Sequence, residues 1–184
     1  MNIGIVVFDG FTDLDFYLPW DILNRVRLLD LAPKWKVEIL GSNEKCISAA
    51  GLKLEITKPY TFANECEGVL FCSGPKTREL IEDRKFLASF QLDPDRQSIA
   101  AIDSGSLILG AIGLLRGKRA TTYPTAFKLL EDLGAIPTRE AFVVDGVATA
   151  SRCLSGDKLA LWIIERLTNK IVADQIFETI KPLQ

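Results

Sequence analysis

The sequence predicts an α/β fold that occupies residues 1–184 as one domain, with a mostly parallel sheet covered on both faces by helices. Three short apolar runs, residues 2–8, 68–72 and 99–102, show no alternation with polar residues, which is typical of strands buried on both faces. Segments with helical spacing of apolar residues lie between these runs, as in a parallel sheet. No linker, repeat or low-complexity stretch interrupts the chain.

The first third of the chain predicts a strand, a helix, a second strand and a hairpin. The strand at 2–8 ends in Asp9-Gly10, a turn signal. Apolar residues then recur at helical spacing from Leu14 to Leu29, and we expect Pro19 to lie near the start of this helix, where proline is tolerated. Residues 36–40 predict the second strand, and residues 47–57 predict a hairpin around a glycine.

The middle of the chain predicts two more buried strands, each followed by helix. The strand at 68–72 ends in Ser73-Gly74-Pro75, and short helices are expected at 77–82 and 84–91. The strand at 99–102 leads directly into a helix of small and apolar residues, predicted over 104–115. A strand that turns straight into a helix places one side chain at the edge of the sheet.

The last third predicts a short strand, a helix, a hairpin and two further helices. The strand is expected at 119–122 and the helix at 124–133, closed by a glycine. Asp145-Gly146 is a strong hairpin signal. The helix at 155–168 has one apolar stripe, with Ser155 or Asp157 as its N-cap, and the final helix is expected at 171–180.

Composition excludes several classes of function. The chain has no histidine, so Ser-His-Asp and Cys-His catalysis and histidine-ligated metal sites are excluded. The net charge of −2 and the dispersed basic residues give no reason to expect nucleic acid as a partner. No apolar stretch approaches the ~20 residues that span a bilayer. We therefore expect a cytoplasmic protein with a small-molecule ligand, no membrane partner, no cofactor and no metal.

Three strand ends are the expected place for a site, because ligands bind at the carboxyl ends of parallel strands. They are residues 9–15, 72–76 and 103–105. Asp15, Asp103, Cys72 and several hydroxyl groups lie in them. The sequence therefore predicts a site built from carboxylates, hydroxyls, thiols and backbone groups.

Five segments resemble, in the right order, those of the ThiJ/PfpI superfamily. They are the strand-to-helix turn at 100–115 (AAIDSGSLILGAIGLL), the first loop at 8–19, the glycine-containing loop at 71–80, the segment at 116–123 and the closing hairpin and helix at 145–167. The pattern is most similar to that of isonitrile hydratase-like members. The resemblance implies a flavodoxin-like fold of the class I glutamine amidotransferase type, and a homodimer with its site near the interface.

The resemblance also implies roles for individual residues. Asp103 stands where the family usually keeps its catalytic cysteine, and Tyr123 where isonitrile hydratase-like members usually have histidine. Asp15 matches the acidic residue that faces the cysteine. Ser73-Gly74 matches the loop that supplies oxyanion contacts. The family activities that depend on a thiolate at the turn cannot be carried over to this chain intact.

Asp103 has several interpretations. It can be a catalytic carboxylate, a fixed anion in a binding pocket, or an N-cap of the helix that follows. It can also be a Cys-to-Asp substitution in an active family member, since aspartate resembles a cysteine oxidised to sulfinate.

Asp15 and Asp103 are expected to form a carboxylate pair in which one group holds a proton near neutrality. A helix N-terminus would lower the pKa of Asp103, so Asp15 is expected to be the acid and Asp103 the base or nucleophile. Ser73, Gly74, Ser104 and Tyr123 are the expected substrate-binding residues, with the amides near Gly74 and Ser104 holding developing negative charge.

Other candidates have weaker signals. Cys72 can be a displaced nucleophile, although a buried strand cysteine is far commoner. Lys76 and Arg78 can bind an anionic substrate or be solvated, and Tyr17 and Trp20 can line a pocket or belong to the core. Cys46, Cys66 and Cys153 carry no functional signal.

Two functions remain. One is a small-molecule hydratase or hydrolase that uses the carboxylate pair in place of a cysteine. The other is a catalytically degenerate module that binds or senses a ligand.

Overall fold

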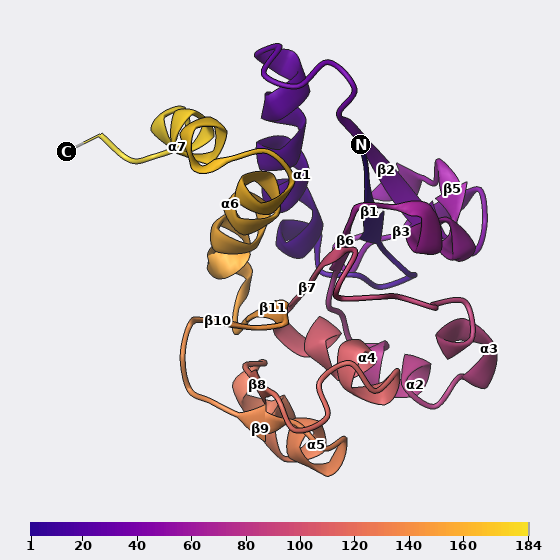
Figure 1. Cartoon of the computed structure of the whole chain (residues 1–184). Helices are drawn as coiled ribbons and strands as arrows, with labels where there is room; N and C mark the ends of the chain where they lie inside the picture. Colours follow the sequence, from indigo (N-terminus) through magenta and orange to yellow (C-terminus); the bar gives the residue numbers. More distant parts are fainter. Residues whose placement is uncertain (184) are drawn as a thin grey trace.

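Seven strands form one sheet at the centre of the computed structural model, which describes residues 1–183 (Figure 1). Their order is β10 (Phe142–Asp145), β11 (Val147–Ala150), β7 (Ser98–Ile102), β6 (Gly68–Phe71), β1 (Asn2–Val6), β2 (Lys36–Gly41) and β5 (Lys58–Pro59). Every neighbouring pair is parallel except β10 and β11. The predicted fold class, a mostly parallel α/β sheet, is confirmed.

Helices cover both faces of this sheet. The long α1 (Asp13–Leu28) lies beside α6 (Gly156–Leu167), which also contacts β7, β11 and α7 (Lys170–Glu178). On the opposite face lie α2 (Thr77–Leu80), α4 (Ser106–Ala111) and α5 (Phe127–Asp132), with α3 (Arg84–Leu87) beyond α2 (Figure 1). Because both faces are covered, β6, β7 and β11 are buried along their whole length, which explains why their sequences are mostly apolar.

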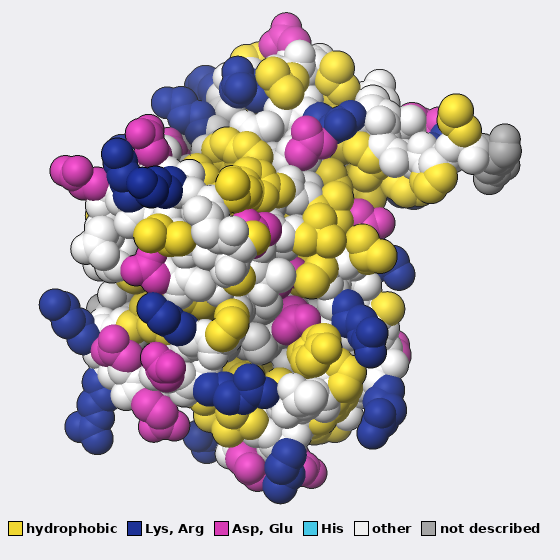
Figure 2. Space-filling view, turned by 180° about the vertical axis from the view of Figure 1, so that it is seen from behind, with side chains coloured by type: hydrophobic (Ala, Val, Ile, Leu, Met, Phe, Trp, Pro, Cys, Tyr) yellow, Lys and Arg dark blue, Asp and Glu magenta, His cyan; other side chains and the backbone are white. Residues whose placement is uncertain are grey.

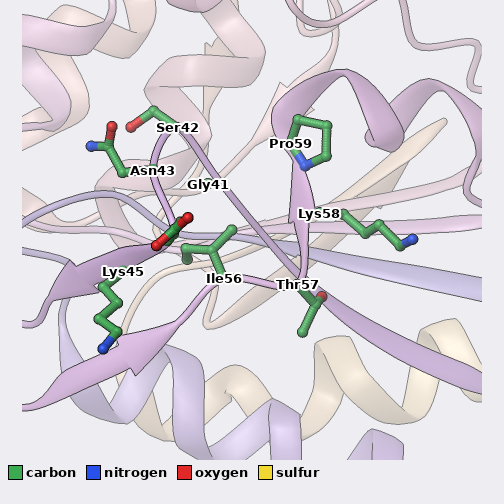
Figure 3. Close-up of a pocket in the computed structure, with 9 residues that line it drawn as sticks. Gly41, Ser42, Asn43, Lys45, Ile56, Thr57, Lys58 and Pro59 are labelled. Atoms are coloured by element: carbon green, nitrogen blue, oxygen red, sulfur yellow. The ribbon is translucent and has the colours of Figure 1, made fainter.

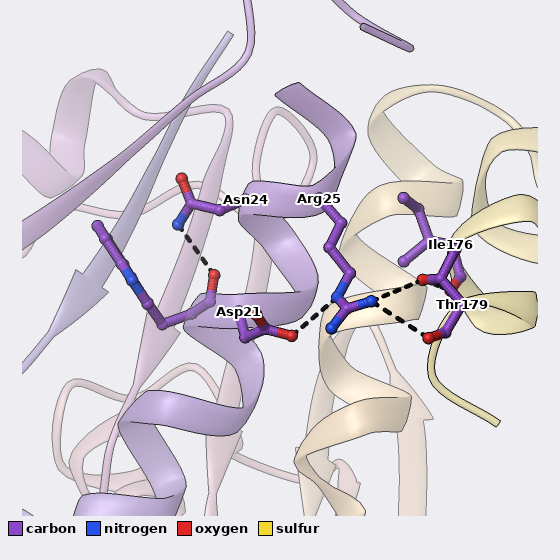
Figure 4. A network of polar contacts seen from close by, with 6 residues as sticks. Asp21, Asn24, Arg25, Ile176 and Thr179 are labelled. Atoms are coloured by element: carbon purple, nitrogen blue, oxygen red, sulfur yellow. Dashed lines mark hydrogen bonds and ion pairs between the residues drawn. The ribbon is translucent and has the colours of Figure 1, made fainter. Parts of the chain in front are cut away.

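The last helix, α7, is held against α1 by packing and by polar contacts. Ala173 and Ile176 of α7 are buried. Arg25 of α1 donates hydrogen bonds to Asp21 at 2.8 Å and to the carbonyl and hydroxyl oxygens of Thr179 at 3.2 and 3.1 Å (Figure 4). Such exposed pairs contribute about 0–1 kcal/mol, so the buried apolar face provides most of the attachment.

Both predicted hairpins are present. β3 (Lys45–Ile47) and β4 (Lys53–Glu55) pair antiparallel around Gly51, and β10 pairs with β11 around Gly146. The two glycines have φ of 91° and 75°, a conformation that costs other residues more.

The structure differs from the sequence prediction at several element boundaries. The helix predicted over 104–115 is shorter, because a 3-10 turn at Asp103–Gly105 precedes α4. The strand predicted at 119–122 is only β8 (Arg119–Ala120), which pairs with an unpredicted β9 (Ile136–Pro137) outside the main sheet. Strand β5 and the 3-10 helix η1 (Tyr60–Glu65) were also not predicted.

Two local expectations about helix α1 and helix α6 are wrong. Pro19 lies in the interior of α1, at its seventh residue. Ser155 precedes α6 without a side-chain capping bond, and the Asp157 side chain accepts only from the amide of the next residue.

The face of the molecule seen in Figure 2 carries charged groups of both signs interspersed with apolar side chains. Within residues 1–183, no helix has the length and apolar character needed to cross a membrane.

Candidate active site

The turn at Asp103 is the most distinctive backbone feature of the structure. Strand β7 ends at Ile102, and Asp103 has a φ of 54°, in the left-handed region that non-glycine residues enter rarely. The Asp103 carbonyl oxygen accepts hydrogen bonds from the hydroxyls of Ser106 at 2.8 Å and Thr122 at 3.0 Å. These two bonds hold the strained residue in place.

Gly105 makes this tight turn possible. A Cβ atom at Gly105 would lie 2.6 Å from the carbonyl oxygen of Cys72 and 2.7 Å from that of Phe71. No side chain fits there, so the turn lies directly against the end of the neighbouring strand β6.

The side chain of Asp103 does not cap α4. Its Oδ1 accepts a 2.5 Å hydrogen bond from the amide of Ser104, the next residue, and no side chain caps the helix at Gly105. The N-cap interpretation of Asp103 is therefore wrong for α4. The α4 helix has only six residues, so its dipole is short.

Asp15 lies in the first turn of α1 and is fully buried. Its Oδ2 accepts a 2.5 Å hydrogen bond from the Ser73 hydroxyl, which comes from the end of β6. Its Oδ1 accepts no hydrogen bond of standard geometry within residues 1–183, although the Cys153 thiol lies close enough to stabilise its charge. Burial raises the pKa of Asp15, and Cys153 and Ser73 partly oppose this effect.

Pro19 explains a second contact of Asp15. Proline has no amide hydrogen, so it cannot donate to the carbonyl of Asp15 four residues earlier. That free carbonyl accepts from the Cys72 thiol at 3.5 Å. Because α1 contains this proline, the Cys72 thiol can form a hydrogen bond with the helix turn that carries Asp15.

Burial raises the pKa of Asp103 to about 6. The hydrogen bond from Ser104 opposes this effect, the charge of Asp15 adds to it, and the Ser73 hydroxyl and the charge of Arg152 also oppose it. The pKa of Asp103 is therefore raised rather than lowered, because burial is the largest effect on it.

The two carboxylates are neighbours without direct contact. The described hydrogen bonds include none between Asp15 and Asp103; Asp15 bonds to Ser73 and Asp103 to Ser104. Burial raises the pKa of both carboxyl groups, and the charge of Asp15 raises that of Asp103 further.

The two amides expected to hold negative charge are already occupied. The Gly74 amide donates to the Thr77 hydroxyl at 3.2 Å, and the Ser104 amide donates to Asp103. The Ser104 hydroxyl lies 3.2 Å from that of Thr77. Gly74 has no room for a side chain, because a Cβ atom there would lie 2.3 Å from the carbonyl oxygen of Gly10.

A cavity of about 310 Å³ opens above Asp103. It contains all of the residues expected to bind substrate and lies at the carboxyl ends of β1, β6 and β7, where such a site was expected. Its lining residues are Thr12, Ser73, Gly74, Pro75, Arg78, Asp103, Ser104, Tyr123, Thr125 and Cys153. Asp15 lies behind Ser73 and does not line it.

Two other cavities lie away from the buried carboxylates. One of about 750 Å³ lies at the end of β2, beside β5, and is lined by residues 41–45 and 56–59 (Figure 3). Another, of about 360 Å³, contains Phe8, Asp9 and Lys76. Lys76 is thus separated from Asp103, whereas Arg78 lines the Asp103 cavity.

Cys72 and the aromatic residues of α1 do not line the Asp103 cavity. Cys72 is fully buried, and burial raises the pKa of its thiol, which agrees with the core interpretation. Trp20 stacks on the buried Phe16 with ring centroids 5.4 Å apart, and Tyr17 packs edge-on against the same ring.

Sequence reasoning missed Cys153 and Arg152. Cys153 lines the cavity, and burial together with the neighbouring Asp15 and Asp103 raises the pKa of its thiol to about 12. Both residues follow β11, which pairs with β7. Knowledge of that strand order would have placed them beside Asp103.

Metal ligands do not gather in this part of the molecule. Within the described residues, no group of three or more cysteine, aspartate or glutamate side chains is placed to hold a metal ion.

Comparisons with known proteins agree with this architecture. Residues 1–166 match the DJ-1/PfpI family. The chain is 30% identical over 169 residues to isonitrile hydratase of Pseudomonas putida, covering 91% of this chain and 72% of that protein. A ThiJ/PfpI family protein from Pseudomonas syringae is similar in structure, with a TM-score of 0.85 and 26% identity over 100% of this chain and 76% of the other.

The fold extends to more distant proteins. Schizosaccharomyces pombe DJ-1 has a TM-score of 0.82 and 15% identity, with both chains covered completely. The family match, the curated relative and the observed fold together show that this chain belongs to the DJ-1/PfpI family.

Proposed function

We propose that the protein is a small-molecule hydratase or hydrolase, similar to isonitrile hydratase, in which Asp103 takes the place of a thiol. The observation that carries this proposal is the strained backbone of Asp103. It holds a carboxyl group with a pKa of about 6 in a cavity. A carboxyl group that titrates near neutrality can give and take a proton within one reaction cycle.

Hydration of an isonitrile requires only proton transfers and the addition of one water molecule. Protonated Asp103 donates its proton to the terminal carbon of the substrate, and water then adds to that same carbon. The carboxylate of Asp103 takes a proton from the added water, and movement of a further proton to nitrogen gives the formamide. Atoms balance as substrate plus water, and no thiolate is required.

Asp15 supports this chemistry from behind the cavity wall. Its negative charge raises the pKa of Asp103, and the bond from the Ser73 hydroxyl fixes its position. Asp103 is therefore the group that exchanges protons with the substrate, and Asp15 sets the pH at which it does so.

The test is to follow an isonitrile and its formamide product by NMR with the purified protein. Asp103→Asn should abolish turnover, and the exposed Asp174→Asn should retain it. Turnover that survives Asp103→Asn would contradict the role of Asp103. An inactive wild-type protein would remove the isonitrile hydratase proposal.

A binding or sensing function without chemistry is the second candidate. It is favoured by the occupied amides of Gly74 and Ser104, since neither is free to stabilise an oxyanion. Ligand binding without turnover by the wild-type protein would favour this function over the first.

We also infer that the protein is a cytoplasmic homodimer with the site near the interface. Leu14 and Tyr17 on α1 and Leu154 next to Cys153 are exposed, with Leu154 at 77%, and such a group of apolar side chains suits a protein contact. Light scattering should give a dimer that Leu154→Glu weakens and Ile171→Glu, on α7, leaves intact. A monomer at micromolar concentration would contradict the inference.

A further inference from the structure

Two arginine side chains at the Asp103 cavity lack a carboxylate partner. Arg78 lines the cavity, and its Nη2 reaches only the carbonyl and hydroxyl oxygens of Thr125, at 3.4 and 3.3 Å. Arg152 lies with its Cζ 5.8 Å from the ring centroid of Tyr123, another lining residue. Within residues 1–183, neither guanidinium forms an ion pair.

Arg152 is close enough to the cavity to act on its chemistry. Its charge lowers the pKa of Asp103, although burial has the larger effect in the opposite direction. The guanidinium thus lies beside the cavity, next to its lining residue Tyr123 and near enough to Asp103 to affect its charge. Because it is not bound by a carboxylate, its donors remain available to a ligand.

The acidic groups around the cavity do not neutralise these two cations. Asp15 is fully buried and bonded to Ser73. Asp103 is the one acidic side chain that lines the cavity, and its pKa of about 6 means that it carries a proton for part of the time near neutrality. When Asp103 is protonated, the lining of the cavity is positive.

We propose that this cavity binds small organic carboxylates, with the carboxylate held by Arg78 and Arg152 and a compact apolar body against Tyr123 and Pro75. Guanidinium groups are suited to carboxylates because their donors form a planar fork. The volume of about 310 Å³ is near the lower end of ligand cavities, roughly 300–1,000 Å³, so the ligand is small. The inference deepens the proposed function, because it names the substrate class of the same cavity.

Binding of such an anion depends on the protonation of Asp103. The titratable and charged groups in the cavity lining are Asp103, Cys153, Tyr123 and Arg78; Asp15 lies behind Ser73, and Arg152 lies beside Tyr123. A ligand carboxylate binds more tightly when Asp103 is neutral, so its affinity rises as the pH falls through about 6. A neutral ligand lacks this dependence.

Benzoate and benzamide are suitable probes, because they have nearly the same shape and differ in charge. Their binding to the full chain is measured by NMR titration at about pH 5 and about pH 8. Benzoate should bind roughly tenfold more tightly than benzamide at the lower pH, the size expected of one charge-assisted hydrogen bond. Equal affinity of the two probes, or no binding of either up to the solubility limit, would overturn the proposal.

Arginine variants test the assignment. Arg78→Gln and Arg152→Gln should each weaken benzoate binding roughly tenfold and leave benzamide binding unchanged. Arg139→Gln is the matched control, since Arg139 also stacks on a ring, that of Phe127 at 5.4 Å, but does not line the cavity. Retention of full benzoate affinity in both cavity variants would overturn the assignment.

Asp103→Asn separates this inference from the proposed catalysis. The variant should lose hydratase activity yet bind benzoate with the same affinity at both pH values. If it binds benzoate with the wild-type pH dependence, another group controls anion binding and the proposed linkage is wrong. Binding without turnover by the wild-type protein would support the anion site and contradict only the catalytic proposal.

Discussion

The hydroxyl of Ser73 donates a 2.5 Å hydrogen bond to Oδ2 of Asp15, and this bond joins the end of β6 to the first turn of α1. A length of 2.5 Å is typical of a hydroxyl that donates to an ionised carboxylate. The bond is one of the few interactions that oppose the cost of burying this charge. Ser73 is therefore important for the stability of the site.

Ser73→Ala should destabilise the protein by about 2 kcal/mol at neutral pH, because a buried carboxylate loses a charge-assisted hydrogen bond. The pKa of Asp15 should rise further. Ser106→Ala is the matched control, since its hydroxyl donates to a neutral carbonyl and its loss should cost about 1 kcal/mol. Urea unfolding checks both values. Equal losses in the two variants would contradict an ionised Asp15.

Stability should increase as the pH falls from about 7 through 6. Burial raises the folded-state pKa of Asp103 from 3.8 to about 6, so the folded state binds a proton before the unfolded chain does. The gain should be roughly 1–2 kcal/mol between about pH 7 and pH 5 after allowance for solvent screening. Asp103→Asn should remove this part of the pH dependence in chemical unfolding. A stability difference between the wild-type protein and its Asp103→Asn variant that is the same at pH 5 as at pH 7 would contradict the raised pKa.

Asp103→Gly should be more stable than Asp103→Ala by about 1 kcal/mol, because a side chain in the left-handed region costs roughly 1–2 kcal/mol. Asp30 has the same φ of 54° at an exposed position and is the matched control. Its Gly and Ala variants should differ by a similar amount. Thermal unfolding provides the comparison. Equal stability of the Gly and Ala variants at 103 would mean that the turn relaxes when the carboxylate is removed.

Alkylation of the folded protein should modify Cys153 before the other three cysteines, which are all buried. The reaction should be slow, because burial and the neighbouring carboxylates raise the pKa of the Cys153 thiol to about 12 and the thiolate is the reactive form. Asp15→Asn removes one of these negative charges and should accelerate the reaction. Mass spectrometry after iodoacetamide treatment measures both rates. A Cys153 that reacts like a free thiol would contradict the contact with Asp15.

The strands of the core could be predicted from the sequence because burial on both faces leaves an unbroken apolar run, as at residues 68–71 and 99–102. Two-residue strands such as β8 and β9 could not, because their pairing depends on contacts between distant segments rather than on local pattern. The helix after Asp103 was predicted too long for a similar reason. The first residues of the predicted helix instead form the tight turn that lies against the neighbouring strand.

The positions of Asp15 and Asp103 in the site followed from strand ends and from family resemblance, whereas their interactions did not. The sequence gives no sign that the amides of Gly74 and Ser104 are occupied, since that depends on the rotamers of Thr77 and Asp103. The prediction from the sequence also gave too little weight to burial, which raises the pKa of Asp103.

The close contacts of Gly74 with Gly10 and of Gly105 with Cys72 involve backbone atoms. The shape of the backbone around the site consequently does not depend on which side chains the site carries. A thiol, a carboxylate or an amide at position 103 would meet the same backbone surroundings, so we expect one substitution there to change the chemistry of the site without changing its shape. Changes at Gly74 or Gly105 would instead force the loops apart, which makes these glycines the positions that a redesign of the site should leave untouched.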